Sequence, residues 1–140
     1  MRTTRFVSGL LLAGALGLTG LSASAVTPAE LQQNFDAAAR AGVPGYTGFS
    51  AQRGRQFFNS THGNDWSCAS CHTQDPAGPG RHAKTGRDIA PLSPVANPQR
   101  FTDPAKADKW FSRNCNDVLG RPCTAQEKGD VLAYLMSLGK

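Results

Sequence analysis

The pentapeptide Cys-Ala-Ser-Cys-His, residues 68–72, stands near the middle of a chain of 140 residues. The spacing C-x-x-C-H is typical of c-type haem attachment, because two intervening residues let both thiols form thioethers with vinyl groups on neighbouring pyrroles. The imidazole that follows directly is then turned toward the iron as an axial ligand. We therefore predict one covalently attached haem c, held by Cys68 and Cys71, with His72 as the proximal ligand.

Other chemistries of a C-x-x-C pair fit the sequence less well. A structural zinc site needs further ligands, and Cys115 and Cys123 lack the usual spacing of about two to four residues. A dithiol redox motif follows a strand in a βαβ unit, and no alternating strand pattern is found in this chain. A plain disulfide between Cys68 and Cys71 would be rarer still.

The first residues have the features of a secretory signal peptide. Two arginines precede the apolar run 6–21, and the small triplet Ala-Ser-Ala follows at 23–25. A membrane anchor needs about 20 apolar residues, whereas this run is shorter and is interrupted by Gly, Ser and Thr. We predict cleavage after Ala25, which leaves residues 26–140 as one monohaem cytochrome c domain in the periplasm.

The charge of the predicted mature chain is only weakly basic. Thirteen Lys and Arg stand against ten Asp and Glu after the two leader arginines are removed, a net charge of +3. This excess is too small to indicate nucleic-acid binding, and it could only bias docking toward an acidic redox partner. All four cysteines lie in the exported part, where thiols can be oxidised or captured covalently.

Capping signals and apolar periodicity predict an all-α protein. Thr27 and Glu30 form a capping box, with Pro at the first helical position, and Thr124 and Glu127 form a second box. A further helix is expected to end near Asn114 and Cys115. The expected helices cover residues 28–41, 51–59, 103–115 and 125–138.

The segment 73–101 should contain no long helix or strand, because five prolines and several glycines interrupt it. A loop of this length in a compact domain is normally functional or disordered. We expect it to wrap one edge of the haem, since a large apolar group fills the volume that such a loop cannot fill itself.

The residue on the far side of the iron is less obvious. Single-haem carriers commonly use a methionine there, but Met1 leaves with the leader and Met136 is expected to fill the core of the last helix. His62 precedes the pentapeptide closely and is expected to be a solvated loop residue. His82, in the wrapping loop, stays open as a sixth ligand.

A longer pattern adds a family resemblance. The stretch TGRDIAPLSPVANPQRFTDPAKADKWFSRNCNDVLGRPCTAQEKGDVLAYL, together with SAQRGRQFF and CASCH upstream, resembles the sphaeroides haem protein group of class I c-type cytochromes. The similarity covers nearly the whole predicted mature chain. It includes R-N-C-N and a second cysteine eight residues on, which ordinary cytochromes c lack.

The resemblance implies a class I cytochrome c fold, with three to five helices around one haem, and an unusual distal ligand. In that group the asparagine before the first non-haem cysteine binds ferric iron and leaves on reduction, so that oxygen, nitric oxide or carbon monoxide can bind. Carried over, this residue is Asn114, and the implied disulfide joins Cys115 to Cys123. An amide oxygen is a neutral, hard and weak donor, which suits ferric better than ferrous iron. Taken without the resemblance, Asn114 would first be interpreted as a polar residue that caps a helix end or meets solvent.

Two functions remain in view at this point. The first is one-electron transfer coupled to reversible binding of diatomic gases, with a redox partner such as a dihaem cytochrome c or a membrane cytochrome b. The alternative is a simple electron carrier with His82 or another fixed sixth ligand. A peroxidase-like enzyme would need a positioned distal acid or base. We identify none and predict no catalytic residue, although reduction of oxygen or nitric oxide stays open.

Overall fold

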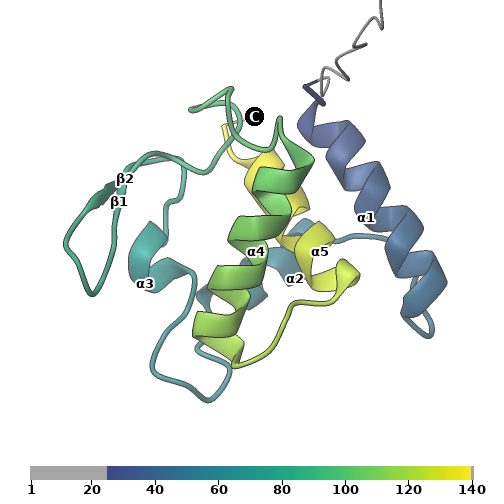
Figure 1. The fold of residues 1–140 in the computed structure, drawn as a ribbon, viewed down its shortest axis with the longest axis horizontal. Helices are drawn as coiled ribbons and strands as arrows, with labels where there is room; N and C mark the ends of the chain where they lie inside the picture. The colour runs from purple at the N-terminus through teal and green to yellow at the C-terminus, as the bar shows by residue number, and fades with distance from the viewer. Residues whose placement is uncertain (1–24, 140) are drawn as a thin grey trace, which may run out of the picture.

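The computed structural model describes residues 25–139, so the predicted signal peptide lies outside the described residues except for its last residue. Within that range no helix is long and apolar enough to cross a membrane. The elements are α1 (Pro28–Gly42), α2 (Ala51–Asn59), α3 (Ala69–His72), β1 (Gly80–Arg81), β2 (Asp88–Ile89), α4 (Pro104–Leu119) and α5 (Ala125–Ser137), as Figure 1 shows. The all-α prediction is confirmed.

Both predicted capping boxes are present. At the start of α1 the Thr27 N–H donates to the Glu30 carboxylate over 2.6 Å, and the Glu30 N–H donates to the Thr27 hydroxyl. At the start of α5 the Thr124 N–H donates to the Glu127 carboxylate over 2.7 Å, with the reciprocal bond at 3.2 Å. Each box satisfies backbone donors that the first helical turn leaves free.

Helix α4 extends further than the sequence indicated. It continues to Leu119 and ends at Gly120, whose φ of 69° gives the left-handed cap that glycine adopts at low cost. Asn114 and Cys115 therefore lie inside the helix, and the prediction that they fall at its end was wrong. The Gly120 N–H donates to the Asn116 carbonyl over 3.0 Å and closes the last turn.

Helices α2 and α5 cross at a close contact that requires glycine. A Cβ on Gly54 would collide with the Asp130 carbonyl group, so the two backbones touch at this point. The buried Asp130 carboxylate accepts from the Ser50 N–H over 2.7 Å and from two guanidinium nitrogens of Arg53 over 2.8 and 2.9 Å. A buried charge is thereby paired and hydrogen-bonded, as burial demands.

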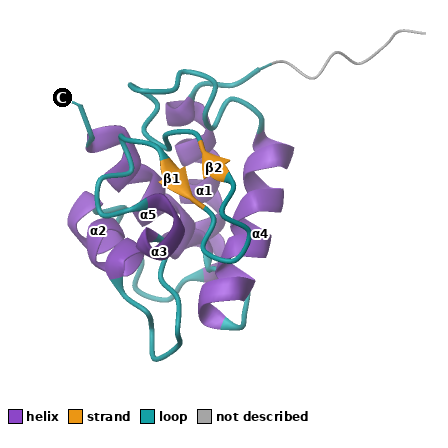
Figure 2. Cartoon of the chain, turned by 90° about the vertical axis from the view of Figure 1, so that its left-hand side faces the viewer, coloured by secondary structure: helices purple, strands orange, loops and turns teal. Residues whose placement is uncertain are grey.

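The core consists of two buried clusters that meet at α5. Leu31 and Phe35 of α1 pack with Ala107 of α4 and Leu132 of α5. Phe58 of α2 packs with three residues of α5 in the second cluster, and its ring lies 5.6 Å from that of Tyr134 in an edge-to-face arrangement. Figure 2 shows α2 and α5 grouped on one side of the chain and α4 on the other.

The segment between α3 and α4 contains one small ribbon, which the sequence did not indicate. Strands β1 and β2 pair antiparallel, with Gly80 opposite Ile89 and Arg81 opposite Asp88. The rest of the segment is irregular, in agreement with its proline content. Figure 2 shows this ribbon and α3 next to one another at the front of the molecule.

The α2–α5 contact yields a stability prediction. We expect Gly54→Ala to lower the free energy of unfolding by about 1–3 kcal/mol, because the added methyl group meets backbone atoms that cannot move aside. Guanidinium-chloride unfolding of the haem-loaded protein would measure the change.

Gly42→Ala is the matched control, since nothing lies within 4 Å of a Cβ at this helix position. We expect it to leave stability unchanged or to raise it slightly. An unfolding midpoint for Gly54→Ala equal to that of the original chain would contradict the assignment of the contact.

Candidate functional site

The pentapeptide forms α3, a single helical turn. The His72 N–H donates to the Cys68 carbonyl over 3.0 Å, which brings the first and last residues of the motif onto one turn. Before it, Ser67 and Ser70 exchange bonds between backbone N–H and side-chain oxygen at 3.0 and 3.2 Å. Thr73 then takes a positive φ of 63° and ends the helix. Local interactions alone therefore hold both thiols and the imidazole together.

The two thiols are available for covalent attachment. Cys68 and Cys71 stand on the same turn but do not form a disulfide, and both are partly buried. Burial raises the pKa of Cys68 to about 11, so this group is a neutral thiol at neutral pH. The Cys71 sulfur accepts a weak hydrogen bond from the Ala83 N–H over 3.4 Å.

The His72 ring is suited to metal ligation. Burial, followed by the charges of Arg100 and His82, lowers its pKa to about 4, which keeps the imidazole neutral. Its ring centroid lies 6.2 Å from that of Phe58 in the buried cluster. The ring makes no hydrogen bond to any residue between 25 and 139, so its nitrogens stay free for iron. The donor set of two free thiols and a neutral imidazole fits haem c.

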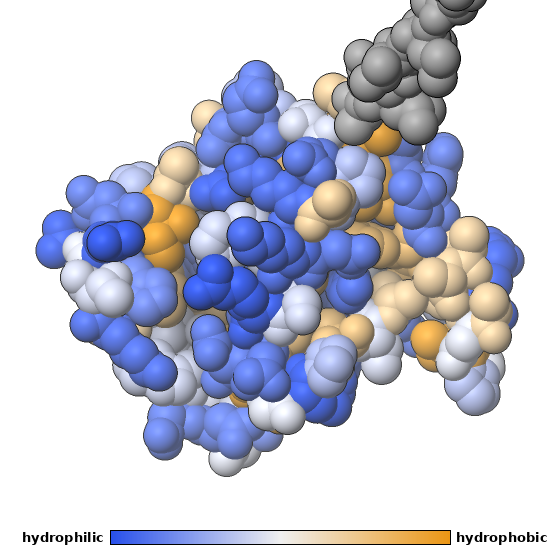
Figure 3. Space-filling view, viewed as in Figure 1, coloured by the Kyte–Doolittle hydropathy of each residue, from blue (hydrophilic) through white to orange (hydrophobic). Residues whose placement is uncertain are grey.

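The β1–β2 hairpin is packed directly against this turn. A Cβ on Gly80 would collide with the Cys71 carbonyl oxygen and would come within 3.0 Å of the His72 Cα atom. Glycine at this position thus allows the ribbon to approach the motif. Figure 3 shows a small apolar patch exposed between the hairpin and α4, separated by hydrophilic surface from a broader apolar area on the α1 side of the view.

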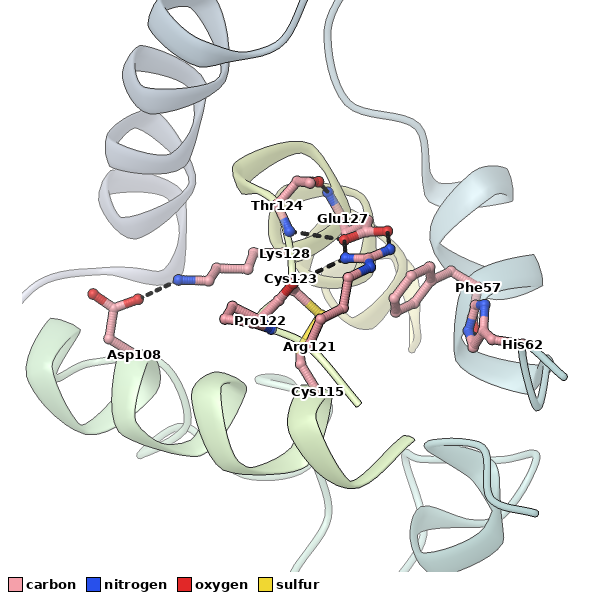
Figure 4. Close-up of a disulfide and its surroundings, with 10 residues drawn as sticks. All are labelled: Phe57, His62, Asp108, Cys115, Arg121, Pro122, Cys123, Thr124, Glu127 and Lys128. Atoms are coloured by element: carbon pink, nitrogen blue, oxygen red, sulfur yellow. Dashed lines mark hydrogen bonds and ion pairs between the residues drawn. A yellow bond between two sulfur atoms is a disulfide. The ribbon is translucent and has the colours of Figure 1, made fainter. Parts of the chain in front are cut away.

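Cys115 and Cys123 form a disulfide that ties α4 to the start of α5 (Figure 4). Both cysteines are buried, and the Cα atoms are 5.6 Å apart. Within the loop that they close, Arg121 forms a bidentate ion pair with Glu127 at 2.7 and 2.9 Å. The disulfide implied by the resemblance is confirmed.

Asn114 directly precedes this disulfide and is exposed on α4. Asp108 marks the flank of α4 that faces α5, because its carboxylate accepts from the Lys128 ammonium over 2.7 Å. At about 100° per residue, Asn114 lies roughly 120° around the helix from Asp108. Trp110, one turn earlier and 46% exposed, shares the Asn114 flank. Figure 1 places α3 and the hairpin on the side of α4 away from α1.

The other candidate ligands are engaged elsewhere. The His62 ring packs on Phe57 at 4.4 Å and bonds the Phe57 carbonyl at 2.9 Å, so the expectation of a solvated loop residue was wrong. His82 lies in the hairpin beside α3, where its Nδ1 accepts from the Thr85 N–H over 3.2 Å. Met136 is partly buried against the α1–α4–α5 cluster, in agreement with its predicted core role.

Comparison with known proteins assigns the family. Residues 44–135 match the family model described as a domain of unknown function, DUF1924. The cytochrome c-type protein SHP of Cereibacter sphaeroides is 44% identical over 136 residues, which cover 94% of this chain and 97% of that protein. Cytochrome c'' of Methylophilus methylotrophus is 40% identical over 117 residues, which cover 80% of this chain and 81% of that one.

Solved structures agree with the sequence relatives. Oxidised SHP, described as an oxygen-binding cytochrome c, superposes with a TM-score of 0.70 at 44% identity, covering 79% of this chain and 96% of SHP. Oxidised cytochrome c'' gives 0.71 at 38% identity and covers 81% of this chain and 95% of its own. This chain therefore belongs to the DUF1924 family and is an SHP-like class I c-type cytochrome that carries haem c.

Proposed function

We propose that this chain is an exported monohaem cytochrome that transfers single electrons and binds diatomic gases at a position vacated by Asn114 on reduction. The observation that carries the proposal is the position of Asn114, which is exposed on the same flank of α4 as Trp110 and directly precedes the disulfide residue Cys115. The description of the relative SHP as an oxygen-binding cytochrome c supports it.

In this proposal Cys68 and Cys71 tether the haem, and His72 holds the iron from the proximal side. Haem c would supply a one-electron couple and an iron that can take a further ligand besides His72. The free thiols and the neutral imidazole on one turn support these roles, since a metal ligand must be present in its unprotonated form. The hairpin packs directly against the Cys71 carbonyl and covers this side of the turn.

Asn114 acts as the redox-controlled gate. Its amide oxygen is a neutral, hard donor, so it holds ferric iron better than the softer ferrous form. The adjacent disulfide limits how far this part of α4 can move, and the amide therefore returns to the same place after reoxidation. In the chain-entropy model a loop of this size contributes about 2–3 kcal/mol to stability, by restricting the unfolded chain.

No stronger donor competes with Asn114 in this proposal. Met136 packs into the core, and His62 bonds the Phe57 carbonyl. The ring of His82 is bonded within the hairpin that packs on the CASCH turn. The alternative function, a simple carrier with His82 as fixed sixth ligand, would require this hairpin to release the ring.

We assign electron transfer and ligand binding rather than catalytic turnover, because the relatives are cytochromes and we identify no distal acid or base. The apolar run at 6–21 and the small triplet at 23–25 support export to the periplasm after cleavage behind Ala25. The mature protein would then be residues 26–140.

We further propose that the β1–β2 hairpin is where a redox partner cytochrome docks. Arg81, Lys84 and Arg87 are exposed there, and Asp88 is the one acidic residue among residues 80–89. Because the hairpin contacts the Cys71 carbonyl and sulfur, an acidic partner held on it would stand next to the haem attachment. The partner would be another cytochrome, of the dihaem or membrane type.

Gas binding can be tested directly on the reduced protein. We expect carbon monoxide to shift the Soret band of the ferrous form, because the weak amide ligand leaves a free position. The ferric form serves as the control and should not respond. An unchanged ferrous spectrum under saturating carbon monoxide would favour the simple electron carrier.

Replacing Asn114 by Met tests the gate itself. A thioether binds ferrous iron firmly, so Asn114→Met should weaken carbon monoxide binding at least about tenfold, which corresponds to about 1.4 kcal/mol. Titration of the reduced protein with carbon monoxide would measure the affinity. Asn116→Met is the matched control, since Asn116 is equally exposed two residues along α4. A ferric spectrum that changes in His82→Ala but not in Asn114→Met would identify His82 as the ligand.

The docking proposal predicts a local charge effect on electron transfer. Lys84→Glu should slow oxidation of the ferrous protein by anionic hexacyanoferrate(III) several-fold at low ionic strength and should speed oxidation by a cationic cobalt phenanthroline complex. Both effects should disappear at high salt. Lys109→Glu makes the same charge change on α4 and should have a smaller effect; equal effects of both variants would reject the hairpin as the entry point.

A further inference from the structure

Arg100 is a half-buried cation without an acidic partner. Its guanidinium donates to the Pro91 carbonyl over 2.9 Å and to the Ala90 carbonyl over 2.7 Å. None of the ion pairs within residues 25–139 includes it. Burial lowers the pKa of Arg100, although the group stays charged at neutral pH. The other N–H groups of the Arg100 guanidinium have no acceptor among the described residues.

The contacts around Arg100 connect it to the segment that follows the CASCH turn. Pro91 is followed by Leu92, whose N–H donates to the Pro76 carbonyl over 2.9 Å. Pro76 lies only four residues after His72 in the sequence. Leu92 and Cys68 pack against the same buried cluster, which contains Phe58. Phe58 in turn lies against the His72 ring. The positive charge of Arg100 is also one of the causes that keep His72 neutral.

The backbone next to Arg100 is held in a costly conformation. Phe101 has a φ of 61°, which is rare for a bulky residue, and its ring packs against both core clusters and lies 6.4 Å from that of Phe111 in α4. Such positions persist where the surrounding structure over-determines them, and they concentrate at functional sites. The anchored Phe101 ring fixes the direction of the chain that carries Arg100.

A half-buried guanidinium whose remaining N–H groups have no acceptor in the described part of the chain can bind an anion. The cofactor of this family brings two, since haem carries two propionate carboxylates, and a guanidinium fork matches a carboxylate in a bidentate geometry. We propose that Arg100 binds a haem propionate and acts as a positioning residue that raises the reduction potential.

The proposed contact has a functional consequence. A fixed positive charge near the haem favours the ferrous form, which carries one positive charge fewer. Arg100 would thus set the potential at which an electron arrives and, if the Asn114 gate proposed above operates, the potential at which that gate opens. The carbonyl bonds to Ala90 and Pro91 keep the guanidinium in place in both redox states.

The experiment compares three variants of the haem-loaded protein, with resonance Raman spectroscopy and spectroelectrochemistry as readouts. Arg100→Gln should shift the propionate bending band, which responds to hydrogen bonding. It should also lower the ferrous-to-ferric ratio at a fixed potential about tenfold. This corresponds to a reduction potential that is lower by about 59 mV for a one-electron couple. Arg100→Lys keeps the charge but not the fork, and should shift the band while retaining most of the potential.

Lys109→Gln is the control, because it removes one exposed cation from α4, away from the hairpin. It should move neither readout appreciably. An unchanged propionate band in both Arg100→Gln and Arg100→Lys, or an equal fall in potential in Lys109→Gln, would overturn the assignment. If Arg100→Gln fails to fold, the band in Arg100→Lys still decides. Carbon monoxide binding tests the gate separately, so failure of one proposal leaves the other intact.

Discussion

The haem-attachment turn, residues 68–72, sets the main requirement on the rest of this chain. Residues 68–72 bring two thiols and an imidazole together through a bond between the His72 N–H and the Cys68 carbonyl, and no distant contact is needed for that. A haem attached there is large and apolar, so the chain must cover it on several sides. The close approach of Gly80 to Cys71 and the packing of Phe58 near His72 are two parts of that cover.

Helices α2 and α5 form a tightly joined frame beside the turn, because α2 also carries Phe58, whose ring lies near that of His72. The contact between Gly54 and Asp130 locks α2 to α5, and the Arg53–Asp130 ion pair reinforces it from within. Helix α4 joins this frame through the disulfide at Cys115. In the proposed function, this frame lets the weak donor Asn114 leave the iron and return to the same place.

Charge is distributed unevenly around the turn. His72 is kept neutral by burial and by a nearby cation, which suits a metal ligand. Arg100 provides that cation from a half-buried position, whereas the cations of the hairpin are exposed. The half-buried cation can act on the haem itself, because buried charges are screened far less than exposed ones. The exposed cations of the hairpin can act on molecules that approach the haem. The small net charge of the chain gives no hint of this difference.

Much of the fold and the core of the site could be predicted from the sequence, because the signals are local. The Thr27 and Thr124 capping boxes and the C-x-x-C-H spacing operate within a few residues, and the family resemblance supplied the disulfide of Cys115. Only the tertiary structure could decide the remainder. Helix α4 runs past Asn114 because Gly120 ends it and buried Cys115 and Val118 hold its last turns in the core. The hairpin pairs just two residues on each strand and packs against Cys71, and Arg100 bonds the carbonyls of Ala90 and Pro91 rather than an acidic side chain. Such features follow from which groups burial brings together, and no local pattern of residues encodes that.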